Sequence, residues 1–472
     1  MKFRFFSIFI FLLFWHIAAT ALNSPLILPL PLDVAANLGA VFTDANSVRH
    51  IAKTILRVFL AFVFAFASGS VLGAASALNS YIKDFFVFFL SMVRSIPVVS
   101  IILLLIFWFN SDFVPVIAAF LMALPVVTDS VRETMEKLPV RFLDAAKVYG
   151  FSRAKTFFYV RLMHAKNAFF SSAKSAFGLC WKVASAAEVL CLPKFALGSA
   201  LYNAKIALEI DKVFALTILI AALCFLFECL FFDCVPIIVK KVFKHVASHG
   251  QGDKGKIIAP NAFDAASQDA VIEDAPVEDV IIEHITVSRG KTVALSDFSA
   301  RFPAFSLTAI MAPTGSGKTT LLDAIAGLIP LDCGMIHNAA KCSYMFQGGE
   351  LFPWFSVQKN VELVLTHIAH NERARYAQYF LARTKILHKS SCLPNEISGG
   401  EKQRAALARS FAYKAPILLM DEAFKSQDTA QKLELFEILR DMLHKEKRTV
   451  ILVTHDIEEA KLLQATIVTL PA

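Results

Sequence analysis

Residues 305–322, FSLTAIMAPTGSGKTTLL, decide the fold of the C-terminal half of this 472-residue chain. Residues 306–311 alternate small or polar with apolar side chains, as a half-buried strand does, and the residues from Thr319 onward show helical periodicity. The loop between them has the form G-x-x-x-x-G-K-[ST], with alanine in place of the first glycine. Its residues, with the threonine that follows, are Ala312, Pro313, Thr314, Gly315, Ser316, Gly317, Lys318, Thr319 and Thr320.

This loop predicts a site for the phosphates of ATP. Successive backbone N–H groups at a helix N-terminus form a concave anion site. Lys318 would contact the β and γ phosphates, and the hydroxyl of Thr319 would bind Mg²⁺. Ala312 makes a positive φ costly at the first loop position. On its own the loop fits a glycine-rich turn equally well, so the other motifs decide between the two interpretations.

The composition predicts that part of the chain lies in a membrane. Apolar residues make up 56% of it and the mean hydropathy is +0.57, which is too high for an ordinary soluble enzyme. The bases that give the net charge of +8 flank apolar runs and are not clustered with stacking aromatic residues. This favours membrane lipid, and not nucleic acid, as the partner. The eight cysteines form no C-x-x-C pair, so neither a metal site nor a disulfide framework is expected.

Six apolar runs predict an all-α membrane domain over residues 1–245. If the runs alternate in direction, the basic groups beside them fall on one side, which the positive-inside rule makes the cytoplasm. Both termini are then cytoplasmic, in a multi-pass protein of the cytoplasmic (inner) membrane. The first run also fits a signal peptide cleaved after residues 19–21, but it is long enough to cross a membrane. The runs are residues 5–22, 51–78, 85–109, 113–131, 167–190 and 213–238.

The remainder of the chain predicts a linker and an α/β domain. Residues 246–278 are rich in glycine, alanine and acidic residues and have no apolar period, which is typical of a flexible linker. Residues 279–472 alternate strand-like and helix-like runs, which predicts a largely parallel sheet. The strand-like runs are residues 280–287, 305–311, 416–420 and 449–454, and the helical runs are 320–328, 400–412 and 430–446.

One strand of this domain ends in two carboxylates. Residues 417–422, ILLMDE, have the form of a buried strand, and open α/β sheets bind ligands at the C-terminal ends of such strands. Asp421 would hold Mg²⁺ through water, and Glu422 would orient the attacking water as a general base. The plain alternative is a strand that ends in a solvated acidic turn.

The run ISGGEKQR, residues 397–404, places a serine and two glycines at the start of a helix, where N–H groups and the helix dipole face an anion. With this run, residues 280–472 resemble an ATP-binding cassette (ABC) ATPase. The resemblance makes Gln347, in YMFQ, the Q-loop glutamine that couples Mg²⁺ to the membrane partner. It makes His455, in VTHD, the switch histidine that contacts the γ phosphate. The core of the signature motif is Ser398, Gly399 and Gly400, after isoleucine where leucine is usual.

The chain also departs from the family pattern. Ala312 replaces the first loop glycine, and Arg289 stands near the aromatic residue that stacks on adenine, where its guanidinium plane would stack instead. After the glutamate, residues 425–428 read KSQD and keep only the aspartate of S-A-L-D. The resemblance implies that the phosphate loop of one cassette faces the signature motif of another. A homodimer with two ATP sites is therefore expected.

A second resemblance concerns the membrane half. Residues 144–150, DAAKVYG, followed by VRLM at 160–163, resemble the E-A-A-x3-G coupling loop of bacterial importer permeases, with aspartate in place of glutamate. A short basic amphipathic helix closed by glycine is the plain alternative. The related permeases are those for nitrate, sulfonates, taurine and thiamine-precursor pyrimidines, in which the loop docks beside the Q-loop. We expect a coupling loop at 142–163 with Asp144, Ala145, Ala146 and Gly150 as its key residues.

Taken together, the resemblances imply an ATP-driven importer with permease and ATPase in one chain. It would move a small solute, such as an organic anion or a vitamin precursor, delivered by an external substrate-binding protein. Lys182 and Glu188 are ionisable groups within an apolar run and are expected to line the path of the solute. Two alternatives remain: a membrane-anchored ATPase that regulates a partner without transport, and a nucleotide-binding scaffold that does not hydrolyse ATP.

Overall fold

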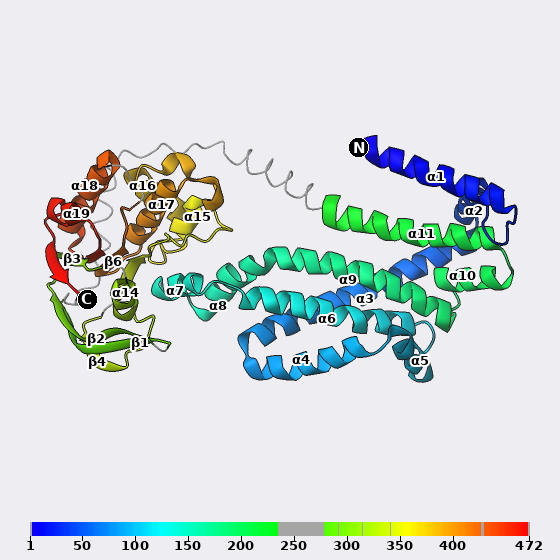
Figure 1. Ribbon diagram of the computed structural model, residues 1–472, viewed down its shortest axis with the longest axis horizontal. Coiled ribbons are helices and arrows are strands. Elements are labelled where there is room, and N and C mark those ends of the chain that lie inside the picture. The colour runs from blue at the N-terminus through cyan, green and yellow to red at the C-terminus, as the bar shows by residue number, and fades with distance from the viewer. Residues whose placement is uncertain are drawn as a thin grey trace. The chain divides into compact units, whose positions relative to one another are not determined.

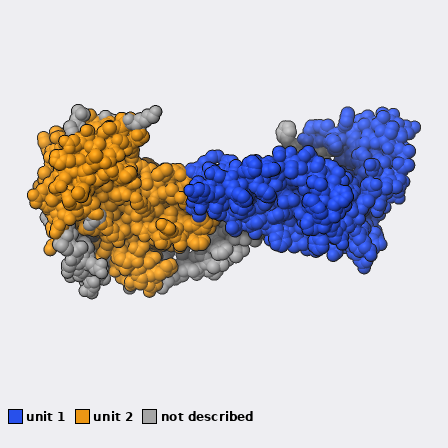
Figure 2. Space-filling view, turned by 90° about the horizontal axis from the view of Figure 1, so that it is seen from below, with its two compact units in different colours: residues 1–137, 164–254 blue, residues 138–163, 255–472 orange. Residues whose placement is uncertain are grey.

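The computed structural model describes residues 2–234, 278–290, 292–313, 315–339, 341–425 and 429–470. The chain divides into two compact units (Figure 2). Unit 1 holds Met1–Lys137 and His164–Lys254, and unit 2 holds Leu138–Met163 and Gly255–Ala472. All of the predicted linker except Glu278 lies outside the described residues.

The described part of unit 1 is helical (Figure 1). Two of its helices, α3 and α6, pack closely because Gly69 and Gly73 of α3 lie against α6. A Cβ atom on Gly73 would lie 2.6 Å from the carbonyl oxygen of Thr128, so only a hydrogen side chain permits this approach. The helices are α1 (Lys2–Leu22), α2 (Pro31–Thr43), α3 (Ala45–Leu78), α4 (Ser80–Ser95), α5 (Val98–Trp108), α6 (Val114–Glu136), α9 (Leu162–Cys191), α10 (Leu197–Ile206) and α11 (Ile210–Glu228), which continues as a π-helix (Cys229–Cys234).

Three helical segments among the described residues are long and apolar enough to cross a membrane: Ala45–Leu78, Val114–Glu136 and Ile210–Phe232. The predicted span at 85–109 corresponds to two helices, α4 and α5, which are long and apolar enough only as a pair and meet at an angle of 98°. The cause is local: Pro97 disfavours helical geometry at Ile96, which has φ −80° and ψ 130°. The count of six spans remains a prediction.

Unit 2 contains two sheets. One is a five-stranded parallel sheet in the order β5-β6-β7-β3-β8, as the alternation of strands and helices predicted. The other, β2-β1-β4, is antiparallel and was not predicted. The strands are β1 (Val280–Arg289), β2 (Thr292–Phe302), β3 (Leu307–Met311), β4 (Cys333–His337), β5 (Cys342–Met345), β6 (Ile417–Asp421), β7 (Thr449–Val453) and β8 (Thr466–Thr469).

Helices connect the strands of unit 2, and three of them match predicted helical runs to within three residues at each end. They are α14 (Lys318–Ile325), α17 (Gly399–Ala412) and α18 (Thr429–Glu446). The others are α15 (Val357–Glu362), α16 (Arg373–Arg383), α19 (Ile457–Leu462) and the 3₁₀ turns Leu387–Lys389 and Pro394–Glu396.

Unit 2 also includes residues 138–163, which we call the docking segment. It contains α7 (Val140–Val148), α8 (Arg153–Thr156) and a π-helix (Phe157–Arg161), and it ends inside the first turn of α9. Ala145, Tyr149 and Val160 are fully buried in the same hydrophobic core as the ATPase strands. The docking segment is therefore an integral part of the fold of unit 2, although in sequence it lies between helices α6 and α9 of unit 1.

Candidate nucleotide-binding and hydrolysis site

Four neighbouring strands of the parallel sheet bring the predicted catalytic residues to one edge. The strands β5, β6, β7 and β3 are adjacent and in register, with Met345 opposite Met420, Met420 opposite Leu452 and Leu452 opposite Ala309. The residues that follow their C-terminal ends are therefore brought together. These are Gln347 after β5, Asp421 and Glu422 at the end of β6, His455 after β7, and the phosphate loop after β3.

The phosphate loop has the expected strand–loop–helix geometry. Gly315 and Gly317 have positive φ values of 90° and 84°, and Gly317 caps α14. Ala312 is not among the residues with positive φ, so the alanine is tolerated without strain there. Lys318 Nζ donates to the carbonyl oxygens of Ala312 (2.8 Å) and Pro313 (2.6 Å), and burial lowers the pKa of Lys318. Of the predicted loop residues, Thr314 lies outside the described part of the chain.

Thr319 and Asp421 provide oxygen ligands that suit Mg²⁺. Thr319 Oγ1 donates to Asp421 Oδ2 at 2.8 Å, which joins the start of α14 to the end of β6. Burial raises the pKa of Asp421, and the hydrogen bond from Thr319 opposes this effect. No group of three or more His, Cys, Asp or Glu side chains in the described residues is arranged to hold a metal. Two protein oxygens fit an ion that takes its other ligands from phosphate and water.

Glu422 is the centre of the residues predicted to hydrolyse ATP. His455 Nε2 lies 2.5 Å from its Oε1, and Gln347 Nε2 donates to its Oε2 at 2.7 Å. Lys425 Nζ pairs with the same Oε2 at 2.9 Å. Burial favours a higher pKa for Glu422, but the hydrogen bonds from Lys425, Gln347 and His455 prevail and lower it. The carboxylate is therefore ionised, and each of its two oxygens has a polar partner.

The backbone at Glu422 is also unusual. Its φ of 48° lies in the left-handed region, which costs a non-glycine residue about 1–2 kcal/mol. Its N–H donates to the carbonyl oxygen of Val453 at 3.0 Å, which extends the β6–β7 pairing by one residue. This pairing fixes the carboxylate beside the loop that carries His455. Lys425 departs from the family pattern, and the sequence did not predict its contact with Glu422. The other three residues of this run, Ser426, Gln427 and Asp428, lie outside the described residues.

Arg289 has a partner that the sequence did not predict. Its Nη2 donates to Asp323 Oδ2 of α14 at 2.6 Å, so the guanidinium is paired with a carboxylate. Its side chain remains half exposed. Stacking of Arg289 on adenine therefore stays a prediction.

The signature residues form a helix start that is open to solvent. Ser398 Oγ accepts from the N–H of Glu401, and the Glu401 carboxylate accepts from the N–H of Ser398. This reciprocal capping box fixes the first turn of α17, and Ser398 and Gly399 are exposed. The hydrogen bond from the Ser398 N–H holds the pKa of Glu401 below its ordinary value. An anion held by another molecule can reach this helix end.

The predicted coupling residues all lie on unit 2. Ala145 and Ala146 are fully buried in its core, and Gly150 has φ 64°, which ends α7 in the left-handed region. Burial raises the pKa of Asp144, while the charge of Arg141 opposes this.

Several contacts of the docking segment were not predicted from the sequence. Tyr149 Oη donates to the carbonyl oxygen of Tyr344 at 2.8 Å, three residues before Gln347. The guanidinium of Arg409 lies 4.9 Å from the ring centre of Tyr149 and donates to the carbonyls of Gly349 (2.8 Å) and Glu350 (2.9 Å). The Q-loop is therefore held between the docking segment and the signature helix.

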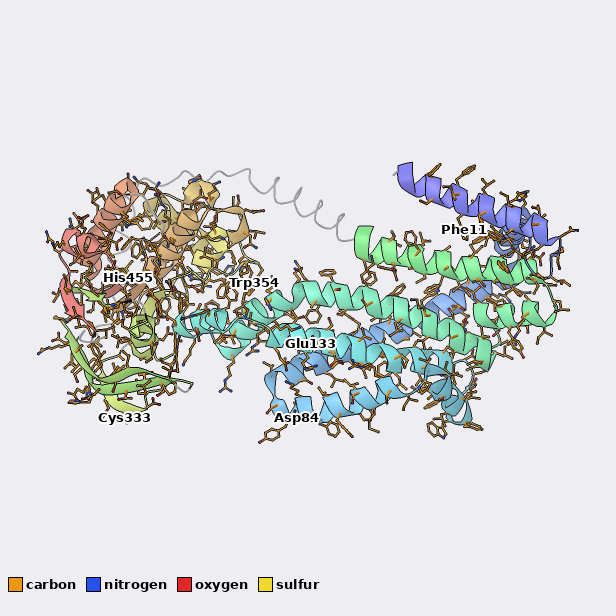
Figure 3. The ribbon with its side chains drawn as sticks, viewed as in Figure 1. Phe11, Asp84, Glu133, Cys333, Trp354 and His455 are labelled. Carbon is orange, nitrogen blue, oxygen red and sulfur yellow. The ribbon has the colours of Figure 1, made fainter. Side chains whose placement is uncertain are left out.

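The aromatic run at 352–355 supports the other end of the docking segment. Trp354 Nε1 donates to the carbonyl oxygen of Tyr159 at 2.8 Å, within the π-helix. Lys155 Nζ donates to the carbonyl oxygen of Leu363 at 2.6 Å. Figure 3 shows Trp354 beside the docking segment and His455 farther from it within unit 2. The run FPWF in the sequence was the available signal for this surface.

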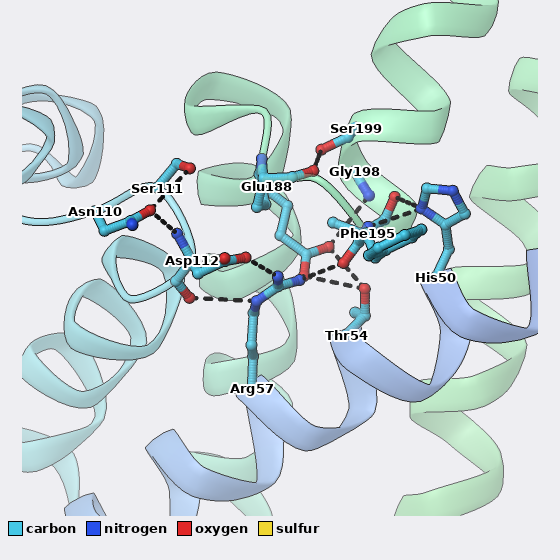
Figure 4. Close-up of polar contacts among 12 residues, drawn as sticks. His50, Thr54, Arg57, Asn110, Ser111, Asp112, Glu188, Phe195, Gly198 and Ser199 are labelled. Atoms are coloured by element: carbon cyan, nitrogen blue, oxygen red, sulfur yellow. Dashed lines mark hydrogen bonds and ion pairs between the residues drawn. The ribbon is translucent and has the colours of Figure 1, made fainter. Parts of the chain in front are cut away.

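The two residues expected on the solute path are separated in unit 1. Lys182 is exposed. Glu188 is fully buried, and its carboxylate accepts from Thr54 Oγ1 (2.9 and 3.0 Å), Arg57 Nη1 (2.9 Å) and the N–H of Gly198 (3.2 Å). Arg57 also binds Asp112 at 2.5 Å (Figure 4). The charge of Glu188 ties α3, α9 and the start of α10 together, and the place of Lys182 and Glu188 on the solute path stays a prediction.

Comparisons with known proteins match two families to the two halves of the chain. Residues 295–425 match the family described as ABC transporter, and residues 69–232 match the family described as binding-protein-dependent transport system inner membrane component. The chain is 37% identical over 185 residues to the nitrate import ATP-binding protein NrtD of Synechocystis sp., which covers 37% of this chain and 70% of that protein.

Other relatives are similar. The aliphatic sulfonates import ATP-binding protein SsuB 1 of Paracoccus denitrificans is 37% identical over 183 residues, covering 38% of this chain and 74% of that protein. A solved dimeric structure of an ATP-binding cassette in a post-hydrolysis state, bound to ADP and Pi, is 26% identical with a TM-score of 0.38, and covers 40% of this chain and 94% of that chain. The chain therefore belongs to the ABC transporter family and joins an importer-type permease domain to an ABC ATPase domain in one polypeptide.

Proposed function

We propose that this protein imports a small inorganic or organic anion, such as nitrate or a sulfonate, across the cytoplasmic membrane as a homodimer driven by two MgATP. The observation that carries the proposal is the docking segment, which lies between α6 and α9 in sequence yet packs into the core of the ATPase unit beside the Q-loop. The substrate class rests on relatives whose names state import of nitrate or aliphatic sulfonates. An external binding protein would deliver the solute, as the permease family description implies.

The residues of the site suggest how ATP is used. The phosphate loop and Lys318 would bind the phosphates, and Thr319 and Asp421 would hold Mg²⁺, which screens charge on the transferred phosphoryl group. Lys318 would leave the carbonyls of Ala312 and Pro313 to reach the phosphate. Glu422 would then orient water, with His455 and Gln347 released toward the γ phosphate and Mg²⁺.

A second chain would complete each site. The exposed start of α17 presents Ser398, Gly399 and the positive end of the helix dipole to solvent, as a surface for the ATP of a partner copy. Closure of two ATPase units would move the Q-loop, which is held by Tyr149 and Arg409, and so move the docking segment. The docking segment continues directly into α9, which would carry the motion into the permease.

The first test is ATP hydrolysis and uptake by the purified chain in liposomes, with a binding protein present and ¹⁵N-nitrate or an alkyl sulfonate as solute. Glu422→Gln should reduce hydrolysis by about 10²-fold or more. ATP binding should persist in this variant, which separates loss of the base from loss of the site. Near-normal hydrolysis would remove Glu422 from the role of base, and ATP binding without phosphate release by the wild type would favour the non-hydrolysing scaffold.

A second experiment tests transport against regulation without transport. Tyr149→Ala removes a fully buried side chain of the docking segment and should lower uptake per ATP hydrolysed. Arg153→Ala, in the same segment but exposed, serves as the matched control. Equal uptake in Tyr149→Ala and wild type would favour a membrane-anchored ATPase that regulates a partner.

A further inference from the structure

One buried carboxylate on α14 has three partners from three different elements. The side chain of Asp323 is 3% exposed. It accepts from Arg141 Nη1 of α7 (3.0 and 3.4 Å), Arg289 Nη2 at the end of β1 (2.6 Å) and Tyr344 Oη of β5 (3.2 Å). Arg141 belongs to the docking segment but lies one residue before the predicted coupling loop. Asp323 is not among the residues that the sequence predicted for the ATP site.

The exposures of the partners are unequal, and this decides which group depends on the others. The side chains of Arg141 and Arg289 are 34% and 51% exposed, so both cations keep contact with water. Asp323 has almost no such contact, and a buried carboxylate without partners is strongly disfavoured. Asp323 therefore needs the arginines more than either arginine needs Asp323.

Asp323 lies in the C-terminal half of α14 but shares a face of this helix with a residue of the phosphate loop. It is four residues after Thr319, so the two side chains lie on the same face of the helix, one turn apart. Through Arg141, the docking segment therefore contacts the helix that carries Thr319.

The C-terminal end of α14 makes a second contact with a cation of the docking segment. Lys147 Nζ donates to the carbonyl oxygen of Gly327 at 2.5 Å, just after the helix ends. Carbonyl groups at a helix C-terminus carry partial negative charge, which attracts cations. Arg141 and Lys147 lie six residues apart on α7. Both contact the C-terminal half of α14 and the residues just after it, where the helix dipole is negative. The two surfaces are complementary in charge.

Tyr344 links the same carboxylate to the Q-loop strand. Its hydroxyl donates to Asp323, while its backbone carbonyl accepts from Tyr149 Oη. Both tyrosines are fully buried. The guanidinium of Arg141 lies 5.7 Å from the ring centre of Phe346, the residue before Gln347. The docking segment is therefore attached to α14 and to β5 through a closed set of bonds.

We propose that Asp323 is the specificity-determining residue by which the ATPase domain recognises its docking segment, with Arg141 as the cation that it selects. Asp323 is a positioning residue: it acts through Arg141 and Tyr344 and not on ATP. A docking segment without a cation at position 141 leaves the buried carboxylate short of one partner and is rejected. The biological role of this recognition rests on the proposed transport function, but the contact between Arg141 and Asp323 can be tested without ATP.

The test uses the full chain in lipid nanodiscs without nucleotide. Amide hydrogen–deuterium exchange of peptides covering residues 140–150 reports how firmly the docking segment is held. Arg141→Gln should raise exchange in these peptides by about tenfold, because one charged hydrogen-bond pair to a buried acid is lost. Arg141→Lys keeps the charge and should restore part of the protection.

The decisive comparison is a double-mutant cycle with Asp323→Asn. If Asp323 is what Arg141 recognises, Arg141→Gln should have little further effect once Asp323 is replaced. Arg289→Gln is the matched control, since it removes a cation from the same carboxylate but lies outside the docking segment. The amide exchange rates of residues 140–150 in this variant should stay within about threefold of those in wild type, because Asp323 then depends more on Arg141. Additive effects of Arg141→Gln and Asp323→Asn, or unchanged exchange in Arg141→Gln, would overturn the proposal.

A transport measurement separates this inference from the proposed function. In liposomes, Arg141→Gln should lower the solute imported per ATP hydrolysed at least threefold. If wild type imports neither anion, the proposed substrate fails, while the exchange measurements still decide the role of Asp323. If wild type imports and Arg141→Gln does so with the same yield per ATP, the recognition role of Asp323 is refuted and the proposed function stands.

Discussion

Gly317 allows the phosphate loop to turn into α14, and alanine there should destabilise the ATPase unit. The residue has φ 84°, and a Cβ atom would lie 2.4 Å from the carbonyl oxygen of Ala294 and 2.9 Å from Leu295 Cδ2. The first atom belongs to the backbone of β2, so the contact is relieved only by moving a strand. Gly315 is a matched control: its φ is 90°, but a Cβ atom there has no neighbour within 4 Å.

The magnitudes follow from this difference. Each substitution places alanine in the left-handed region, which costs about 1–2 kcal/mol. Gly317→Ala adds an overpacking cost of about 1–3 kcal/mol, which Gly315→Ala does not have. For a domain of this size 1 kcal/mol corresponds to about 2–4 °C in unfolding temperature. Gly317→Ala should therefore unfold about 2–12 °C below Gly315→Ala.

The assay is thermal unfolding of the full chain in detergent without nucleotide, since an added methyl group at Gly315 is unopposed only in the free loop. The transition of the ATPase unit is identified in wild type as the one that MgATP raises. A loss in Gly315→Ala equal to or larger than that in Gly317→Ala would refute the reasoning, because it would show that backbone conformation and not the clash with β2 controls this position.

Three other outcomes are expected. Burial, with the charges of Arg373 and Lys359, lowers the pKa of Lys155 from 10.5 to about 8. Between these two pH values the unfolded chain binds a proton at Lys155 that the folded chain lacks, so the free energy of unfolding should rise with pH. Amide hydrogen exchange of residues 150–160, corrected for intrinsic rates, should show this rise in wild type and not in Lys155→Met. Lys425→Ala removes a cation from Glu422 and should raise basal ATP hydrolysis a few-fold, measured as phosphate release; a decrease would show that Lys425 assists the base. Glu188→Gln breaks a buried ion pair and should lower the free energy of unfolding by about 3–5 kcal/mol. Asp112→Asn, at a carboxylate that is 54% exposed, should lower it by about 0–1 kcal/mol. Equal denaturation midpoints of the two variants in detergent would contradict the assignment of Glu188 as the buried partner that holds helices α3, α9 and α10 together.

The local motifs of the ATPase domain were predictable because each is specified by short stretches of sequence. Two glycines with positive φ followed by Lys318 produce a phosphate loop wherever a strand precedes them. The parallel sheet was predictable for the same reason, since its strands are continuous apolar runs such as residues 417–420. The antiparallel sheet was missed because β4 is largely exposed and its residues carry no apolar alternation.

In the membrane half, too, some features could be predicted from the sequence and others could not. The apolar runs were visible, but the 98° bend between α4 and α5 was hidden inside one of them. Pro97 was the available signal, and its effect on the preceding residue is known in general. The partners of Glu188 were not visible, because they lie on α3 and at the start of α10.

The sequence by itself determined the chemistry of this protein: a phosphate loop, a strand that ends in Asp421 and Glu422, a signature helix start and His455, all specified by local spacing. Only the tertiary structure decided which side chains meet. Arg141 and Asp323 are separated by 182 residues, and Arg57 and Glu188 by 131, so no local pattern relates either pair. Such pairs form because packing of distant elements buries a carboxylate with a cation within reach, and burial is a property of the folded chain and not of any segment within it.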